Sequence, residues 1–204
     1  MRTLILSDLH LGNGGEYDIF AGSESLPALL DRFVDPPTRV ILNGDSMDFL
    51  LNEDPLRLFI SRAVHQAESI AAAQSTAPTL NALGRICAGG GEVLVRLGNH
   101  DVELALAEIQ EIFRDHMNQP PSVSQKMIFE RGNEPHILKV GGAATLFTHG
   151  EQNDPFNQVD YEHLPGSRAS GPVSAQDFEY SPGSVLVKEL LNPLKKEYHM
   201  RFAD

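Results

Sequence analysis

The chain has 204 residues, 41% hydrophobic and 22% charged, a composition typical of one globular domain with room for a sizeable core. Its formal net charge of −12 argues against a general binder of nucleic acids or acidic membranes, because both require a basic face. No apolar run approaches the length that crosses a membrane, and a single cysteine, Cys87, excludes an intrachain disulfide framework and indicates a reducing, cytoplasmic compartment.

Strands and helices are expected to alternate along the chain. Apolar runs and turn residues predict strands at 2–7, 39–42, 92–97, 126–131, 136–140 and 144–148, and apolar stripes predict helices at 25–34, 55–87 and 102–117. The long region 55–87, a helical insertion between the second and third strands, starts with Asp54-Pro55 and is interrupted near Pro78. This order predicts a single domain over 1–204 with a parallel sheet covered by helices, and the Gly141-Gly142 turn predicts a hairpin in a second, antiparallel sheet.

Four of the expected strands end in residues that commonly bind metal ions. They close with Asp8-Leu9-His10, with Asn43-Gly44-Asp45-Ser46-Met47-Asp48, with Gly98-Asn99-His100-Asp101 and with His149-Gly150. Because the carboxyl ends of parallel strands meet at one edge of a sheet, these side chains are expected to lie together. Imidazole and carboxylate ligands suit divalent transition metals such as Mn, Fe, Zn, Co or Ni, and a shared carboxylate can hold two ions about 3.5–4 Å apart. Asp45 is the best candidate for that bridge, because it lies between the others in chain order and follows a glycine.

Together the four motifs, which cover about residues 1–150, resemble the calcineurin-like metallophosphoesterase superfamily. The resemblance implies an α/β fold, the four-layer αββα sandwich, and a hydrolase of phosphate esters that uses a two-metal centre. It places Asp8 and His10 on the first metal, Asp45 between the metals, and Asn99 and His149 on the second. It makes His100 a general acid or a charge stabiliser at the leaving oxygen, and Asp48 the carboxylate that orients His100. A metal-bound hydroxide would attack phosphorus in line.

One motif of that superfamily is missing from this chain. Its members normally end their site with Gly-His-x-His on a late strand, one histidine for each metal, and no Gly-His pair occurs here. One interpretation is a truncated chain that lacks the last strands of the fold and has an apolar face left exposed or buried by self-association. The alternative is a complete domain with a degenerate site, a weak metal binder with a non-catalytic binding or structural role. If the chain is complete and active, His163 is the first candidate for a replacement ligand.

The segment 151–184 is rich in Pro, Gly, Ser and Asp and directly follows the fourth ligand motif. A loop of this length in a compact domain is usually functional or disordered. It is interpreted as a lid or cap that faces the substrate, with Arg168 reaching a phosphate, or else as a poorly ordered excursion. A small phosphomonoester or diester is the expected substrate, and nucleic acid is not, because Lys and Arg total 16 against 28 acidic residues. Asp101 is expected to cap the helix that starts at Val102.

Overall fold

The fold is built on a parallel sheet of four strands in the order β1-β2-β3-β4. The computed structural model describes residues 1–52, 56, 58–131, 135–164 and 178–198. The sheet consists of β1 (Arg2–Leu6), β2 (Thr38–Asn43), β3 (Glu92–Arg96) and β4 (Met127–Glu130). A separate antiparallel hairpin is formed by β5 (His136–Val140) and β6 (Ala143–Phe147).

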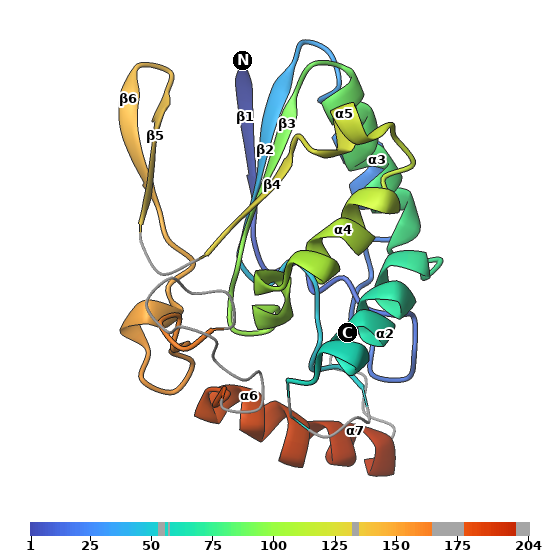
Figure 1. Ribbon diagram of the computed structural model, residues 1–204, viewed down its shortest axis with the longest axis vertical. Helices are drawn as coiled ribbons and strands as arrows, with labels where there is room; N and C mark the ends of the chain where they lie inside the picture. Colours follow the sequence, from blue (N-terminus) through green and yellow to red (C-terminus); the bar gives the residue numbers. More distant parts are fainter. Residues whose placement is uncertain (53–55, 57, 132–134, 165–177, 199–204) are drawn as a thin grey trace.

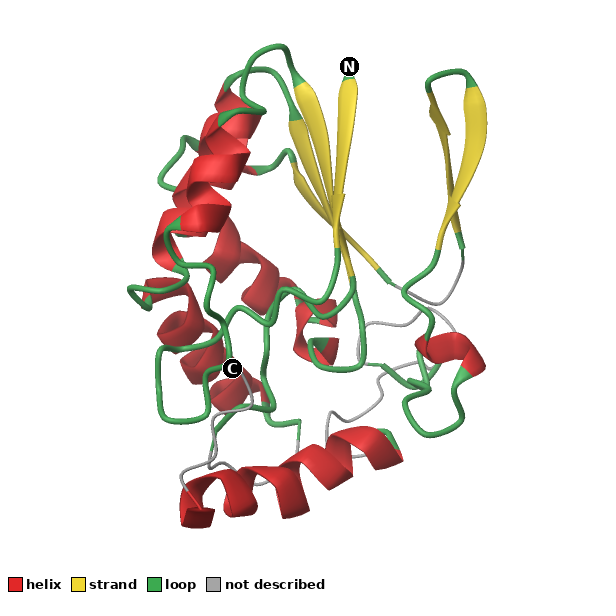
Figure 2. Cartoon of the chain, turned by 180° about the vertical axis from the view of Figure 1, so that it is seen from behind, coloured by secondary structure: helices red, strands yellow, loops and turns green. Residues whose placement is uncertain are grey.

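Helices cover one face of this sheet, and the hairpin lies over the other (Figures 1 and 2). The helical elements are α1 (Ser25–Asp31), α2 (Ile60–Ala72), α3 (Ala77–Ala88), the 3-10 turn η1 (Val102–Ala105), α4 (Ala107–Asp115), α5 (Pro121–Ser124), the 3-10 turn η2 (Glu151–Asn153), α6 (Pro182–Leu186), the π-helical turn η4 (Val187–Leu191) and α7 (Asn192–Tyr198). The expected α/β class with a parallel sheet is confirmed. The described residues form a helical layer, the sheet and the hairpin, so the fourth layer stays a prediction. No helix in the described part of the chain is long and apolar enough to cross a membrane.

All three expected helices differ from their predicted bounds, and the one expected at 25–34 ends at Asp31. The helix assigned to Asp54-Pro55 begins at Ile60 instead, and residues 53–55 lie outside the described ones. The stretch 102–117 is not one helix, because the backbone at its Leu106 is extended and separates η1 from α4. Leu104 and Leu106 are 0% and 6% exposed, and two residues two positions apart on a helix would point in different directions. The break therefore allows both side chains to reach the core.

The face of the sheet opposite the helices is only partly covered. Its central row crosses all four strands in register, with Ile5, Ile41, Leu94 and Ile128 side by side. Phe147 of the hairpin packs on the two central residues of that row. Ile5 and Ile128, on the edge strands, remain 42% and 45% exposed. Both edges of this face therefore carry an exposed apolar side chain, while the apolar face of a truncated chain and self-association through it stay predictions.

Buried polar contacts attach the hairpin to the sheet. Arg96 is 1% exposed, and its Nη1 donates to the Phe147 carbonyl at 2.8 Å and to Asn43 Oδ1 at 3.3 Å. The Asn43 amide donates in turn to the Thr148 carbonyl at 3.0 Å. These bonds fix the end of β6 over β2 and β3, and therefore position His149, the next residue.

Replacing the buried arginine should loosen this attachment. In Arg96→Met the Phe147 carbonyl loses a charged donor, and a hydrogen bond of that kind contributes about 1.5–3 kcal/mol. We expect the free energy of unfolding, measured by urea denaturation, to fall by about 2 kcal/mol. The control is Arg39→Met on the same face, because Arg39 forms a partly exposed ion pair with Glu92 that should contribute less than about 1 kcal/mol. Equal losses in the two variants would contradict the proposed anchor.

Candidate metal centre

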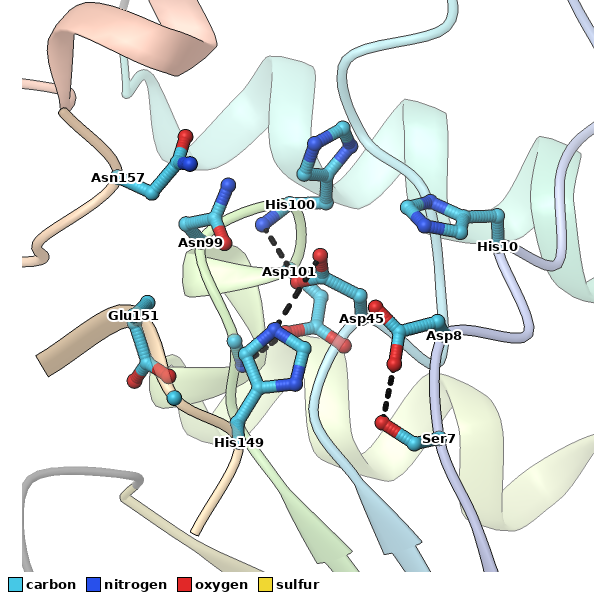
Figure 3. Close-up of polar contacts among 12 residues, drawn as sticks. Ser7, Asp8, His10, Asp45, Asn99, His100, Asp101, His149, Glu151 and Asn157 are labelled. Carbon is cyan, nitrogen blue, oxygen red and sulfur yellow. Dashed lines mark hydrogen bonds and ion pairs between the residues drawn. The ribbon is translucent and has the colours of Figure 1, made fainter. Parts of the chain in front are cut away.

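A cavity of about 380 Å³ opens where the carboxyl ends of the strands meet. It is lined by Asp8, His10, Asp45, Asn99, His100, His149, Gly150, Glu151, Asp154 and Asn157. Figure 3 shows the histidines and carboxylates converging there from separate loops. The structure thus brings together every residue that the sequence analysis placed on a metal, together with His100.

The loops that carry these residues are held in an uncommon backbone conformation. Asp8, His10 and Asp45 have φ angles of 55°, 50° and 50°, in the left-handed region that non-glycine residues rarely adopt. Backbone hydrogen bonds join the two loops, from Asp8 N to the Gly44 carbonyl at 3.2 Å and from His10 N to the Asp45 carbonyl at 2.9 Å. Such strained residues persist where the surroundings hold them and cluster at functional sites.

Two glycines allow the loops to close around Asp45. A Cβ on Gly98 would lie 2.2 Å from Asp45 Oδ1, and a Cβ on Gly44 would lie 2.3 Å from His149 Cγ. Gly44 also has a φ of 86°, which favours glycine. With both positions free of side chains, Asp45 Oδ1 accepts the backbone N–H of His100 at 3.0 Å.

Asp101 precedes η1 at the expected N-cap position, but its side chain does not cap this helix and instead binds the same loops. Its side chain makes no capping bond to η1 and is completely buried. Oδ1 accepts from Gly98 N at 2.6 Å, and Oδ2 accepts from Ser46 N at 2.7 Å and Met47 N at 3.4 Å. Burial, with the charge of Asp45, raises the pKa of the Asp101 carboxyl to about 7 despite these donors. Asp101 therefore ties the loop after β2 to the loop after β3.

The hydrogen bond of His149 determines which of its ring nitrogens faces the cavity. Nδ1 lies 3.0 Å from the Asn43 carbonyl, and because a carbonyl cannot donate, Nδ1 carries the proton. Nε2 then lies 3.4 Å from Asp45 Oδ2. In a neutral imidazole, Nε2 would turn a lone pair toward the carboxylate. A proton on Nε2, or a cation between Nε2 and Oδ2, is therefore required.

Asp48 likewise determines which ring nitrogens of His10 and His100 are free to bind a ligand. Its Oδ2 lies 2.8 Å from His10 Nδ1 and 3.1 Å from His100 Nδ1, and the two rings meet edge to face. Both Nδ1 atoms donate to this carboxylate, which leaves both Nε2 atoms available for a ligand or substrate. From the sequence, Asp48 is expected to orient His100. The structure contains that hydrogen bond and adds His10, which the sequence analysis did not connect to Asp48.

The charges around Asp45 compensate one another. Burial alone would lower the pKa of His100 and His149, but hydrogen bonds and charges from Asp48 and Asp45, respectively, raise each to about 9. Burial would raise the pKa of Asp45, and the two imidazoles lower it instead. The carboxylates therefore stabilise positive charge in the cavity, and this charge can come from protonated imidazoles or from a divalent cation.

Two groups of possible ligands share one carboxylate. His10, Asp45 and His100 form one group, and Asp8, Asp45 and His149 form the other. Within each group the ligand atoms all lie within 4.8 Å of one another. Nitrogen and carboxylate oxygen donors in this number fit a divalent transition metal. The grouping differs from the expected division, since it combines His10 with His100 and Asp8 with His149, while Asn99 lines the same cavity.

His163, the candidate for a replacement ligand, does not reach this cavity. His163 is 63% exposed at its side chain, and its Nδ1 bonds to Asp160 Oδ2 at 2.6 Å. It does not line the cavity, so the structure gives no support to its role as a replacement ligand. Arg168 lies outside the described residues, as does much of the expected lid over 151–184.

Three residues that line the cavity were not singled out from the sequence, and all lie in η2 or in the segment that follows it. They are Glu151, Asp154 and Asn157. Glu151 is 4% exposed and accepts the Tyr161 hydroxyl at 2.6 Å, and burial raises the pKa of its carboxyl. Their position directly after His149-Gly150 was the only sequence signal.

The comparisons with known proteins agree with this geometry. A family model described as calcineurin-like phosphoesterase matches residues 1–197, nearly the whole chain. The protein therefore belongs to the calcineurin-like phosphoesterase family, whose general activity is the hydrolysis of phosphate esters. The comparison with curated proteins found no significant match.

The close approach of Gly98 to Asp45 can be tested directly. In Gly98→Ala the new Cβ would displace Asp45 Oδ1, and we expect Mn²⁺ affinity to fall by about 10–100-fold, the range for groups that support metal ligands. Isothermal titration calorimetry measures this affinity, and urea unfolding shows whether the variant is folded. Unchanged Mn²⁺ binding in a folded variant would contradict the account of the loop packing.

Proposed function

We propose that the protein hydrolyses phosphate esters with two divalent metal ions held on either side of Asp45. The observation that supports this proposal is that Asp45 belongs to both groups of possible ligands. A single carboxylate between two cations is the arrangement that keeps them within about 4 Å of each other. The other members of each group are nitrogen and oxygen donors, so the residues present fit such a pair of ions.

In this proposal each loop of the site supplies ligands. Asp8 and His10 would hold the first ion, and Asn99 and His149 the second, with Asp45 shared. This is the division that the family resemblance implies, and it separates Asp8 from His149 and His10 from His100, which the structure groups together. Bound ions would supply Lewis-acid charge to the phosphate and lower the pKa of a bound water. Asp48 fixes His10 with Nδ1 protonated, so that Nε2 is the ligand atom, and the Asn43 carbonyl does the same for His149.

His100 acts on the leaving group of the ester. Its Nδ1 donates to Asp48, so Nε2 is the atom available to a substrate in the cavity that His100 lines. Against its burial, the hydrogen bond to Asp48 and the charge of Asp48 raise the pKa of the ring and favour the protonated form, which can donate a proton to the leaving oxygen. Asp48 orients the ring and stabilises its positive charge.

The residues that line the cavity limit the charge and the size of the substrate it can hold. Among the described residues that line it there is no lysine or arginine, so imidazoles and bound cations must balance the charge of the phosphate. A small phosphomonoester or diester suits a cavity of about 380 Å³. Three further proposals rest on the sequence alone. They are that Arg168 contacts a phosphate, that nucleic acid is not a substrate, and that the protein is cytoplasmic.

A second function, that of a weak metal binder without turnover, is favoured by one observation. Each group of possible ligands holds three residues among those described, and the late Gly-His-x-His motif is missing. Loss of a ligand should weaken binding at least as much as loss of a supporting residue, about 10–100-fold. Hydrolysis of para-nitrophenyl phosphate or its bis-ester under excess metal favours the enzyme, and its complete absence favours the binding protein.

Asp45→Asn should lose metal and activity together. An amide carries no charge, so it cannot bridge two cations as a carboxylate does. Metal content by plasma mass spectrometry and turnover of para-nitrophenyl phosphate measure the two effects. Asp154→Asn, which changes a second carboxylate of the same cavity, is the matched control and should keep its metal. Two tightly bound ions in Asp45→Asn would contradict the bridge.

His100→Ala should keep metal but slow the reaction. Removal of a positioned proton donor typically costs about 10²–10⁴-fold in turnover. The exposed His163→Ala is the control and should leave both metal content and turnover unchanged. Because His100 also lies with His10 and Asp45 in one ligand group, loss of metal in His100→Ala would show that it is a ligand instead.

A further inference from the structure

A helix made of α6, η4 and α7 lies beyond the carboxyl ends of the strands, on the side of the molecule that holds the cavity (Figures 1 and 2). The three elements follow one another directly over residues 182–198. Its Ser184 and Asn192 are 1% and 3% exposed, and buried polar side chains of this kind need hydrogen-bond partners. Ser184 Oγ donates to the carbonyl of Asn99, a residue that lines the cavity. The helix is therefore attached through polar contacts close to the site.

Two further side chains of this helix bind the loop that follows β2. Lys188 Nζ donates to the carbonyls of Leu50 at 3.2 Å and Asn52 at 2.6 Å. Asn192 Nδ2 donates to the same two carbonyls, at 2.7 Å and 3.4 Å. Both carbonyls lie in irregular backbone, outside the helices and strands, so no regular ladder of hydrogen bonds fixes them. The helix thus supplies side-chain donors that hold this part of the loop.

Leu50 connects these donors to Asp48. Its backbone N–H donates to Asp48 Oδ1 at 2.9 Å. The other oxygen, Oδ2, accepts from Nδ1 of His10 at 2.8 Å and from Nδ1 of His100 at 3.1 Å. The N–H and the carbonyl of Leu50 belong to successive peptide units, so Leu50 transmits position and not charge along one bond. A shift of Leu50 would turn the carboxylate and change both imidazole contacts.

We propose that Lys188 and Asn192 are positioning residues that hold Asp48, through Leu50, in the orientation that binds both imidazoles. The path runs from the two side chains to the Leu50 carbonyl, from the Leu50 N–H to Oδ1, and from Oδ2 to the rings. Neither Lys188 nor Asn192 lines the cavity, so they act on the rings at a distance. Lys188 is the stronger donor, because a hydrogen bond from an ammonium group is charge-assisted.

The orientation of the two rings decides what they can bind. With Nδ1 of each ring on Asp48, Nε2 of His10 and of His100 is available to a ligand or substrate. A misplacement of about 1 Å by a change far from the chemistry can lower a rate by roughly 10²-fold. This consequence for catalysis rests on the proposed function. The orientation itself is a property of the protein without metal or substrate.

The alternative is that the bonds from Lys188 and Asn192 only attach the helix, and His149 separates the two interpretations. Its Nδ1 bonds to the Asn43 carbonyl at 3.0 Å, a contact that shares no bond with the path through Leu50. If the bonds only attach the helix, their removal treats all three rings alike. If they position Asp48, their removal affects the two rings on Asp48 and leaves His149 unchanged.

Exchange of the ring Nδ1–H protons with water, followed by ¹H–¹⁵N NMR of the metal-free protein, tests the proposal. A hydrogen-bonded proton exchanges when its bond opens, so the rate measures how firmly each ring is held. In Lys188→Met the His10 and His100 protons should exchange about ten-fold faster than in wild type, because a charged donor is lost. Asn192→Leu, which replaces the amide by an apolar group of the same shape, should act in the same direction. Glutamine variants of each histidine assign the signals.

Lys126→Met is the matched control. Lys126 Nζ also donates to a backbone carbonyl, that of Cys87 at 2.9 Å, but this bond ends on α3 and not on the loop after β2. The same substitution there removes the same kind of contact. It should leave the exchange of all three ring protons as in wild type, and urea unfolding shows that each variant is folded.

Unchanged exchange at His10 and His100 in whichever of Lys188→Met and Asn192→Leu folds would overturn the proposal. So would an equal acceleration at His149, which indicates general loosening. The measurement needs neither metal nor substrate, so it separates this inference from the proposed function. If exchange changes as expected in a protein that hydrolyses no phosphate ester, the positioning role stands and the proposed function alone fails.

Discussion

The arrangement of the site depends on one buried carboxylate, Asp45. The residue is 4% exposed, one of its carboxylate oxygens accepts the His100 N–H, and the other faces His149. A buried charge of this kind is costly unless it is paired, and the imidazoles provide that compensation. The strained backbone at Asp45, and the glycines before it and at Gly98, are what allow the loops to surround it.

Much of the site follows from the sequence because of a property of parallel sheets. Strands that run in one direction bring their carboxyl ends to one edge, so residues far apart in the chain meet there. Asp8 and Asp45 follow β1 and β2, Asn99 follows β3, and all three line the same cavity. Apolar runs of four to six residues were enough to place these strands, because both faces of the central strands are buried and their runs are continuous.

The remaining contacts depend on tertiary packing that no local pattern contains. Asp101 bonds to backbone N–H groups of the loop after β2, more than fifty positions earlier in the chain, so its neighbours in sequence favoured a helix cap instead. Asp48 reaches His10 as well as His100 only because two loops meet above it. The break at Leu106 likewise follows from the burial of its side chain and not from helix propensity.

A crystal structure of the chain grown with saturating Mn²⁺, with anomalous scattering used to locate the ions, tests the central claim most directly. The account predicts two anomalous peaks about 3.5–4 Å apart, with the Asp45 carboxylate in contact with both. Asp8 and His10 should lie at one peak, and Asn99 and His149 at the other. A single peak, or two peaks of which only one contacts Asp45, would contradict the shared carboxylate on which the proposed chemistry rests.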